Sequence, residues 1–182
     1  MARISLNPPR TVSYRLGEWY SRRHYGLMLA PGQASGHNPR VLRTIARAEL
    51  SLAKWHTVPT ELKELAVLAA AATLNCSWCM DFGYWVSVTH GLDPVKLRDV
   101  PRWRESDEFT DLERRVLEYA EAMSATPMVV TDDMVTGLRR DLDDEQLVEL
   151  TMMIAVENQR SRFNSALGLT SQGFSDRCRA AT

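Results

Sequence analysis

The sequence predicts an all-α protein, a bundle of about seven or eight helices. Three observations support this prediction. Apolar residues recur at helical spacing along most of the chain, boundary signals separate these segments, and no segment shows the alternation of a half-buried strand. With 182 residues, 45% of them hydrophobic, the chain is long enough to bury one core. We expect an N-terminal arm over residues 1–40, a helical domain over 41–175 and a polar tail over 176–182.

The N-terminal arm contains one predicted helix, from about Val12 to Leu29, between segments rich in proline and glycine. Its aromatic residues include Trp19 and Tyr20. On a short N-terminal helix such side chains indicate packing against the domain or against a neighbouring subunit.

Two helices are predicted next. The segment Pro39–Lys54 is amphipathic. Pro59 then ends one element, and Thr60 is a candidate N-cap for the following helix, which extends to about Leu74. Because this second helix is rich in alanine and leucine on nearly all faces, we expect it to be central and tightly packed.

Boundary signals define the remaining helices. A helix is predicted from Cys76 to His90, and Asp93-Pro94 begins another. Residues 101–107 are predicted to form a loop. The later helix starts are a Thr-x-x-Glu capping box, a threonine cap and an Asp-x-x-Gln motif, namely Thr110 with Glu113, Thr131, and Asp143 with Gln146. The last of these opens a long helix, to about Leu167.

Charge and hydropathy exclude two kinds of partner. The 22 basic and 23 acidic residues are balanced, so the clustered lysine and arginine of a nucleic-acid surface are missing. The N-terminus has no apolar targeting region, and the longest apolar run, near residues 65–74, is shorter than the roughly 20 residues that span a bilayer. We therefore expect a cytoplasmic protein that binds neither nucleic acid nor membrane.

The Cys76-Ser-Trp-Cys79 motif is the strongest chemical signal in the sequence. At positions i and i+3 of a helix the two thiols share a face and come within disulfide reach after a modest adjustment. Close to a helix N-terminus, which Asn75 is predicted to cap, unpaired N–H groups stabilise a thiolate. In a reducing cytosol such a pair is more often redox-active or metal-binding than structural.

Two other interpretations of the cysteine pair stay open on the residues alone. Zinc would need two further ligands, but the chain has no second CxxC motif and its four histidines lack a metal-binding spacing. We predict no metal and no cofactor. The pair could also be two buried core cysteines without chemistry. The third cysteine, Cys178, stands in the polar tail and is predicted to be a bystander.

Glu64 is the candidate proton acceptor for this pair. It precedes Cys76 by twelve residues, on the predicted alanine- and leucine-rich helix, where partial desolvation would suit a general base. Alternatively, Glu61 and Glu64 are both solvent-facing acids of a first helical turn. On the last long helix, Asn158, Arg162 and Asn164 could line a pocket, but hydrogen bonding between helices or subunits is the favoured interpretation.

Residues 58–92, VPTELKELAVLAAAATLNCSWCMDFGYWVSVTHGL, resemble the core repeat of the carboxymuconolactone decarboxylase superfamily, and especially its alkylhydroperoxidase D-like branch. That branch has a glutamate, eleven residues, Cys-x-x-Cys, three residues and a histidine, and here Glu64, Cys76 and Cys79 match the first three positions. The segment EQLVELTMMIAVENQRSRFNSALGLTSQGF is similar to the C-terminal helix of longer members. The resemblance spans roughly residues 40–175.

The resemblance implies an alkylhydroperoxidase D-like fold and an oxidoreductase that reduces hydroperoxides, an antioxidant peroxidase. In that branch the second cysteine, here Cys79, attacks the hydroperoxide, and the first, Cys76, resolves the sulfenate into a disulfide. Glu64 would manage the proton, and a partner dithiol would reduce the disulfide. Family members form homo-oligomers, either trimers or hexamers.

One departure from the family pattern concerns the histidine, which is replaced by Gly83, a residue that cannot carry a proton. His90 is a candidate substitute, but eleven residues beyond Cys79 correspond to about 16 Å along a straight helix. Tyr84 and Asp81 are nearer in sequence and are further candidate accessory residues. Otherwise Glu64 acts alone through water, or another subunit supplies the missing group.

The sequence leaves two alternative functions open. The first is a carboxymuconolactone decarboxylase-like enzyme acting on a small carboxylated lactone. Its branch generally lacks the cysteine pair, and it predicts that cysteine substitution is nearly harmless. The second is a non-enzymatic helical oligomer whose CxxC pair senses redox state, which predicts unperturbed thiols and no turnover. The fold alone does not decide among these functions.

Overall fold

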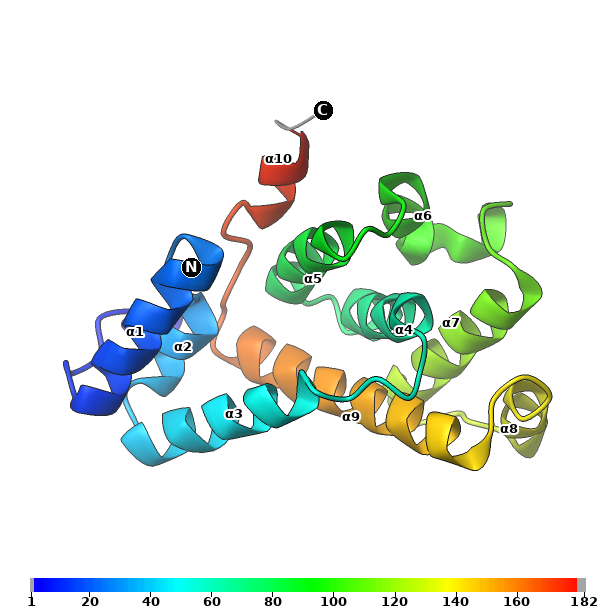
Figure 1. The fold of residues 1–182 in the computed structure, drawn as a ribbon, viewed down its shortest axis with the longest axis horizontal. Coiled ribbons are helices and arrows are strands. Elements are labelled where there is room, and N and C mark those ends of the chain that lie inside the picture. Colours follow the sequence, from blue (N-terminus) through cyan, green and yellow to red (C-terminus); the bar gives the residue numbers. More distant parts are fainter. Residues whose placement is uncertain (1, 180–182) are drawn as a thin grey trace. The chain divides into compact units, whose positions relative to one another are not determined.

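The computed structural model describes residues 2–179, which form ten α-helices, one 3₁₀ helix (η1) and no strand (Figure 1). The all-α prediction is confirmed, and the number of helices is somewhat larger than predicted. The chain divides into two compact units. One comprises the chain up to Trp55 together with Ala166–Leu169, and the other comprises His56–Ser165 and the residues from Thr170 onward. Within residues 2–179 no helix combines the length and apolar content needed to cross a membrane.

The first unit contains α1 (Val12–Tyr25), α2 (Ala30–Ser35) and α3 (Pro39–Leu52). The helix predicted to reach Leu29 ends earlier, because Gly26 adopts a φ of 78° and its N–H bonds to the carbonyl of Arg22. This left-handed glycine is a common helix stop. The chain then starts the short α2, which the prediction missed.

The remaining elements bring distant parts of the sequence together in the second unit. They are α4 (Thr60–Thr73), α5 (Ser77–Thr89), α6 (Pro94–Asp99), η1 (Val100–Glu105), α7 (Asp111–Ser124), α8 (Asp132–Leu138), α9 (Asp144–Ala166) and α10 (Phe174–Arg179). The predicted loop over residues 101–107 is wrong in part, because η1 occupies most of it. The predicted polar tail begins inside α10, and its residues 180–182 lie outside the described part of the chain.

Helix α4 lies in the core of the second unit, as predicted, and packs against both α5 and α7 (Figure 1). Its buried face includes Leu65, Ala66, Leu68 and Ala70, each with no measurable exposure. Because alanines take little space, they allow neighbouring helices to approach closely, and the leucines of α4 belong to the same buried core.

The predicted boundary signals are mostly confirmed. Thr110 and Glu113 form a complete capping box at the start of α7, and Asp93 and Thr131 accept backbone hydrogen bonds at the starts of α6 and α8. The prediction for Thr60 is wrong. It is the first residue of α4, after Pro59, and makes no side-chain cap.

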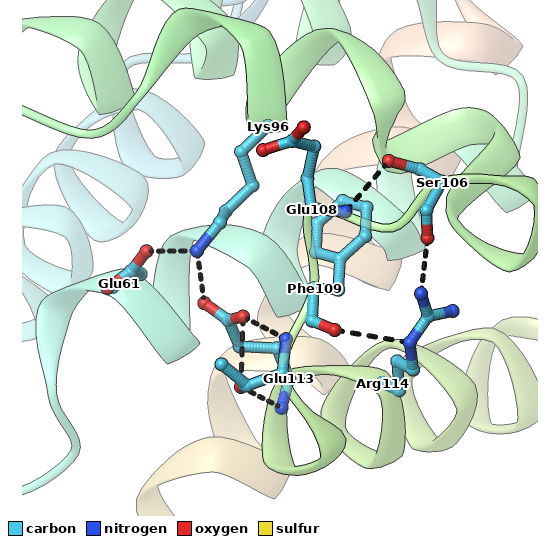
Figure 2. Close-up of polar contacts among 8 residues, drawn as sticks. Glu61, Lys96, Ser106, Glu108, Phe109, Glu113 and Arg114 are labelled. Atoms are coloured by element: carbon cyan, nitrogen blue, oxygen red, sulfur yellow. Dashed lines mark hydrogen bonds and ion pairs between the residues drawn. The ribbon is translucent and has the colours of Figure 1, made fainter.

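Lys96 links three helices through its ammonium group (Figure 2). Its Nζ lies 2.8 Å from Glu113 Oε1 on α7 and 3.0 Å from Glu61 Oε1 on α4. Glu113 Oε2 meanwhile accepts hydrogen bonds from the backbone and hydroxyl of Thr110. Burial alone would raise the pKa of Glu113, but these hydrogen bonds and the lysine charge lower it. The buried carboxylate therefore stays charged and ties α6 to the start of α7.

Candidate active site

The cysteine pair stands at the N-terminus of α5, directly after α4. Asn75 adopts a φ of 53°, a left-handed conformation that asparagine tolerates, and turns the chain between the two helices. The prediction that Asn75 is the N-cap is wrong, because Cys76 takes that position and its Sγ accepts a hydrogen bond from the backbone N–H of Cys79 at 3.3 Å. The two cysteines are joined by a disulfide, with their Cα atoms 5.3 Å apart.

The geometry around Cys76 favours a thiolate once the disulfide is reduced. A sulfur at the N-cap receives a backbone N–H and stands at the positive end of the helix dipole. Both cysteines are buried. The pair is therefore placed for reversible disulfide chemistry in surroundings that limit side reactions with solvent.

Residues of α9 surround the sulfur of Cys79. Ser161 Oγ lies 3.3 Å from Cys79 Sγ, and Asn164 Nδ2 lies 3.4 Å from the same sulfur. Glu157, one turn earlier on α9, accepts a hydrogen bond from Ser161 Oγ at 2.7 Å. The sequence predicted hydrogen bonding between helices or subunits for Asn164, but no role for Glu157 or Ser161. Their spacing places them on one face of the predicted helix, and this pattern could have indicated them.

An open cavity of about 580 Å³ borders Cys76. Tyr84, a predicted accessory residue, lines this cavity, as do Met80 and Arg98. The structure thus brings Tyr84 and Cys76 to one cavity, while Cys79 faces α9. The cavity offers a small molecule apolar contacts and one cationic side chain beside the disulfide.

Glu64 and His90 are brought together at the far end of α5. Glu64 Oε1 lies 3.0 Å from His90 Nδ1, and Glu64 Oε2 accepts a hydrogen bond from Ser87 Oγ at 3.0 Å. Ser87 follows Cys79 by eight residues, a rise of about 12 Å along a helix. A direct proton transfer between Glu64 and Cys79 would therefore need an intervening group, and the catalytic role of Glu64 stays a prediction.

Close helix packing accounts for the glycine at the family's histidine position. A Cβ atom added to Gly83 would lie 3.0 Å from Leu68 Cδ2 on α4. That distance is tighter than most Cβ contacts, so any side chain here would require the Leu68 side chain to shift by a few tenths of an ångström. Gly83 therefore lets α5 lie close to Leu68 without such a shift.

Asp81, another predicted accessory residue, anchors the C-terminal segment. Its Oδ2 accepts the backbone N–H groups of Gln172 and Phe174, and its Oδ1 accepts the N–H and hydroxyl of Ser175, all within 3.0 Å. Burial alone would raise the pKa of Asp81, but the hydrogen bonds from Ser175 and Phe174 outweigh burial and lower it. These contacts give the carboxylate a structural task, and its accessory catalytic role stays a prediction.

Packing of aromatic rings continues this anchor. Phe174 is fully buried, with its ring edge against Phe82. Phe82 also stacks on Trp78, whose indole N–H bonds to Gln172 Oε1 at 2.8 Å. The C-terminal segment therefore covers one side of α5. Across residues 2–179, no group of three or more His, Cys, Asp or Glu side chains lies close enough to hold a metal ion.

Comparison with known proteins shows the family of the chain. The all-α fold and the Cys76–Cys79 pair fit the alkylhydroperoxidase D-like fold that the sequence predicted. The profile of the carboxymuconolactone decarboxylase family matches residues 39–122. The chain is 34% identical over 157 residues to the YnjA protein of Escherichia coli strain K12, an alignment that covers 86% of each chain. The chain belongs to the carboxymuconolactone decarboxylase family.

Solved structures share the fold. The apo debrominase Bmp8 superposes with a TM-score of 0.82 at 18% identity, over 94% of each chain. A Bmp8 variant in complex with 2,3,4-tribromopyrrole gives a TM-score of 0.83 at 17% identity, over 100% of this chain and 99% of that one. A peroxidase-related protein from Ralstonia eutropha JMP134 gives a TM-score of 0.81 at 16% identity, over 96% of this chain and 94% of that one. At these identities the likeness shows the alkylhydroperoxidase D-like fold.

Proposed function

We propose that this protein is a thiol-dependent peroxidase that reduces hydroperoxides with the Cys76–Cys79 pair. The observation that carries the proposal is the disulfide at the start of α5, with polar groups of Ser161 and Asn164 within 3.4 Å of Cys79 Sγ. Donors directed at a sulfur stabilise its thiolate, and the thiolate is the nucleophilic form. The family includes enzymes, and the fold is consistent with a peroxidase-related activity.

The proposed cycle balances in two steps. The Cys79 thiolate attacks the distal oxygen of the hydroperoxide, so that an S–O bond forms, the O–O bond breaks and the alkoxide leaves and is protonated. The Cys76 thiolate then attacks the sulfur of the Cys79 sulfenic acid, so that the S–S bond forms, the S–O bond breaks and the departing hydroxide takes up the proton that Cys76 lost on ionisation. The hydroperoxide is reduced to an alcohol and the dithiol is oxidised. A partner dithiol regenerates the thiols by exchange.

Mixing the reduced protein with one equivalent of an organic hydroperoxide tests the proposal. We expect intact mass to show a loss of two hydrogens, and a change of Trp78 fluorescence to follow the same rate. Cys79→Ser should lower that rate by at least about a hundredfold, because the nucleophile is lost. Cys76→Ser should gain one oxygen atom instead, since the sulfenic acid has no resolving partner.

Each alternative function predicts a different result in this assay. Oxidation no faster than that of free cysteine would contradict the peroxidase. Unchanged turnover of a carboxylated lactone in Cys79→Ser would favour a decarboxylase, and unperturbed thiols without turnover would favour the non-enzymatic redox-sensing oligomer. A brominated pyrrole, as in the Bmp8 complex, is the comparison substrate that distinguishes peroxide reduction from removal of a halide.

We also propose that the protein forms a homo-oligomer through α1, as family membership suggests. Val12, Leu16 and Trp19 on this helix are 85%, 65% and 64% exposed, an unusual amount of apolar surface on one helix. Burial of these side chains against another copy would remove that surface from water.

Light scattering after size exclusion tests the oligomer. The wild type should have a mass above that of one chain, and Leu16→Glu should shift it toward the monomer because a charge cannot be buried there unpaired. Met128→Glu changes an apolar residue that is also 64% exposed and should leave the mass unaltered. A monomeric wild type would refute the assembly.

A further inference from the structure

We infer that Glu157, acting through Ser161, takes the proton from the Cys79 thiol. Helix α9 then supplies the proton path that α5 lacks, because Gly83 stands at the family's histidine position. The inference deepens the proposed function and rests on it, since it concerns how the same cysteine becomes reactive. It depends on hydrogen-bond geometry around one buried sulfur, and each contact belongs to the second unit of the chain.

The three α9 residues form a buried polar row. Glu157, Ser161 and Asn164 are 3%, 0% and 2% exposed, and positions i, i+4 and i+7 share one helix face. Burying a carboxylate in this way is costly unless it is hydrogen-bonded or paired. Glu157 is held by Ser161 at Oε1 and by Arg160 at Oε2, where Nη1 lies 3.5 Å away. Arg160, on the same helix, thus places a cation beside this carboxylate, which is the base in the inferred relay.

Ser161 is placed to pass a proton on. Its single hydroxyl hydrogen can be donated to one acceptor at a time, yet Oγ is 2.7 Å from Glu157 Oε1 and 3.3 Å from Cys79 Sγ. With the disulfide formed, the hydrogen goes to the carboxylate, the stronger acceptor. After reduction, the Cys79 thiol can donate to the free lone pairs of Ser161 Oγ, which completes a chain from sulfur to carboxylate.

The proton transfer balances along this chain. The S–H bond of Cys79 breaks and its proton binds Ser161 Oγ, while the original hydroxyl proton of Ser161 moves to Glu157 Oε1. The products are a Cys79 thiolate and a neutral carboxylic acid at Glu157. The thiolate then accepts hydrogen bonds from Ser161 and from Asn164 Nδ2, and Glu157 donates to Ser161. No net charge enters or leaves the buried site.

Asn164 supports this assignment independently. Within the described residues its Oδ1 is buried and has no hydrogen-bond partner, although Nδ2 faces the sulfur. A buried acceptor without a partner is energetically costly. A half-turn of the amide presents Oδ1 to a thiol hydrogen and Nδ2 to a thiolate, so this side chain can serve both protonation states of Cys79.

The pH profile of Cys79 alkylation tests the relay without any hydroperoxide. We would use Cys76→Ser/Cys178→Ser protein, in which Cys79 is the sole thiol and the serine that replaces Cys76 still offers an oxygen to cap α5. Iodoacetamide labelling followed by intact mass between about pH 5 and pH 10 then gives the Cys79 pKa. We expect Glu157→Gln and Ser161→Ala each to slow labelling by about tenfold or more near neutral pH, where the thiol still carries its proton, and to leave labelling near pH 10 unchanged, because a thiolate needs no base.

Matched variants and a fold control complete the test. Glu145→Gln changes an exposed acid on the same helix and should keep the starting profile, and circular dichroism establishes that each variant is folded. An unchanged rate of labelling near neutral pH in both Glu157→Gln and Ser161→Ala would overturn the relay, as would a loss of rate confined to Glu64→Gln. If the two relay variants slow labelling near neutral pH while hydroperoxide reacts no faster than with free cysteine, the relay stands and the peroxidase proposal fails.

Discussion

Asp81→Ala is expected to lower the free energy of unfolding by about 3 kcal/mol and to release the chain around Phe174. The alanine removes the carboxylate that accepts hydrogen bonds from Gln172, Phe174 and Ser175. Hydrogen bonds to a charged group are each worth more than neutral ones, and a buried N–H left without an acceptor is itself costly. Urea unfolding measures the loss of stability, and limited proteolysis within the C-terminal segment measures the release.

The dependence on pH separates this carboxylate from general packing. Because the folded-state pKa of Asp81 lies below its ordinary value of 3.8, its stabilisation is present above that value and is lost as pH falls through the folded pKa. The stability difference between wild type and Asp81→Ala should therefore be constant near neutral pH and shrink in acid. Glu118→Ala, on an exposed face of α7, should change stability by less than about 0.5 kcal/mol. A difference that persists undiminished at low pH would contradict the anchoring role.

Lys96→Met is expected to cost about 2–4 kcal/mol of folding stability, because it leaves Glu113 charged and buried with only Thr110 as partner. The contribution of Glu61 is small, since its side chain is 48% exposed and water screens the pair. Chemical denaturation of the variant measures this cost. The double variant Lys96→Met/Glu113→Gln should recover part of the loss, because the remaining amide is neutral.

Acid titration provides a second measurement of the same pair. The folded-state pKa of Glu113 lies below its ordinary value of 4.5, so the pair stabilises the fold above that pH and the contribution disappears as pH falls through the folded pKa. Burial alone would lower the pKa of Lys96, but its hydrogen bonds to Glu113 and Glu61 raise it, so the lysine stays charged across the neutral range. If Lys96→Met and wild type unfold at the same denaturant concentration, the pair contributes nothing to stability.

Disulfide formation by the cysteine pair and proton removal from Cys79 need different parts of the fold. Disulfide chemistry needs only α4, the turn at Asn75 and the start of α5, which place both cysteines at one helix N-terminus. Proton removal from Cys79 additionally needs α9 to lie against that sulfur. A variant in which α9 packs less tightly should therefore still form the disulfide. Its Cys79 thiol should lose the proton more slowly.

Local chemistry made much of the fold predictable from sequence. Short sequence segments were enough to predict the capping box of Thr110 and Glu113, the Asp93 cap and the alanine-rich α4. Caps and helical periodicity depend on residues only a few positions apart. The cysteine pair was predictable for the same reason, since its two members are three residues apart. Short 3₁₀ and α segments such as η1 and α2 were missed because their sequences carry no periodic signal.

The groups that surround the reactive sulfur could be identified only in the folded chain. Ser161 and Asn164 are 82 and 85 positions from Cys79, and Glu64 bonds to His90 across 26 positions, separations at which no spacing rule applies. Asp81 is likewise explained by a segment more than 90 positions away. Most of the helices and the disulfide-forming pair follow from neighbours along the chain, so residue patterns were enough to predict them. The partners of each site residue follow from the packing of α5 against α4, α9 and the C-terminal segment, because burial brings distant polar groups to the same sulfur or carboxylate.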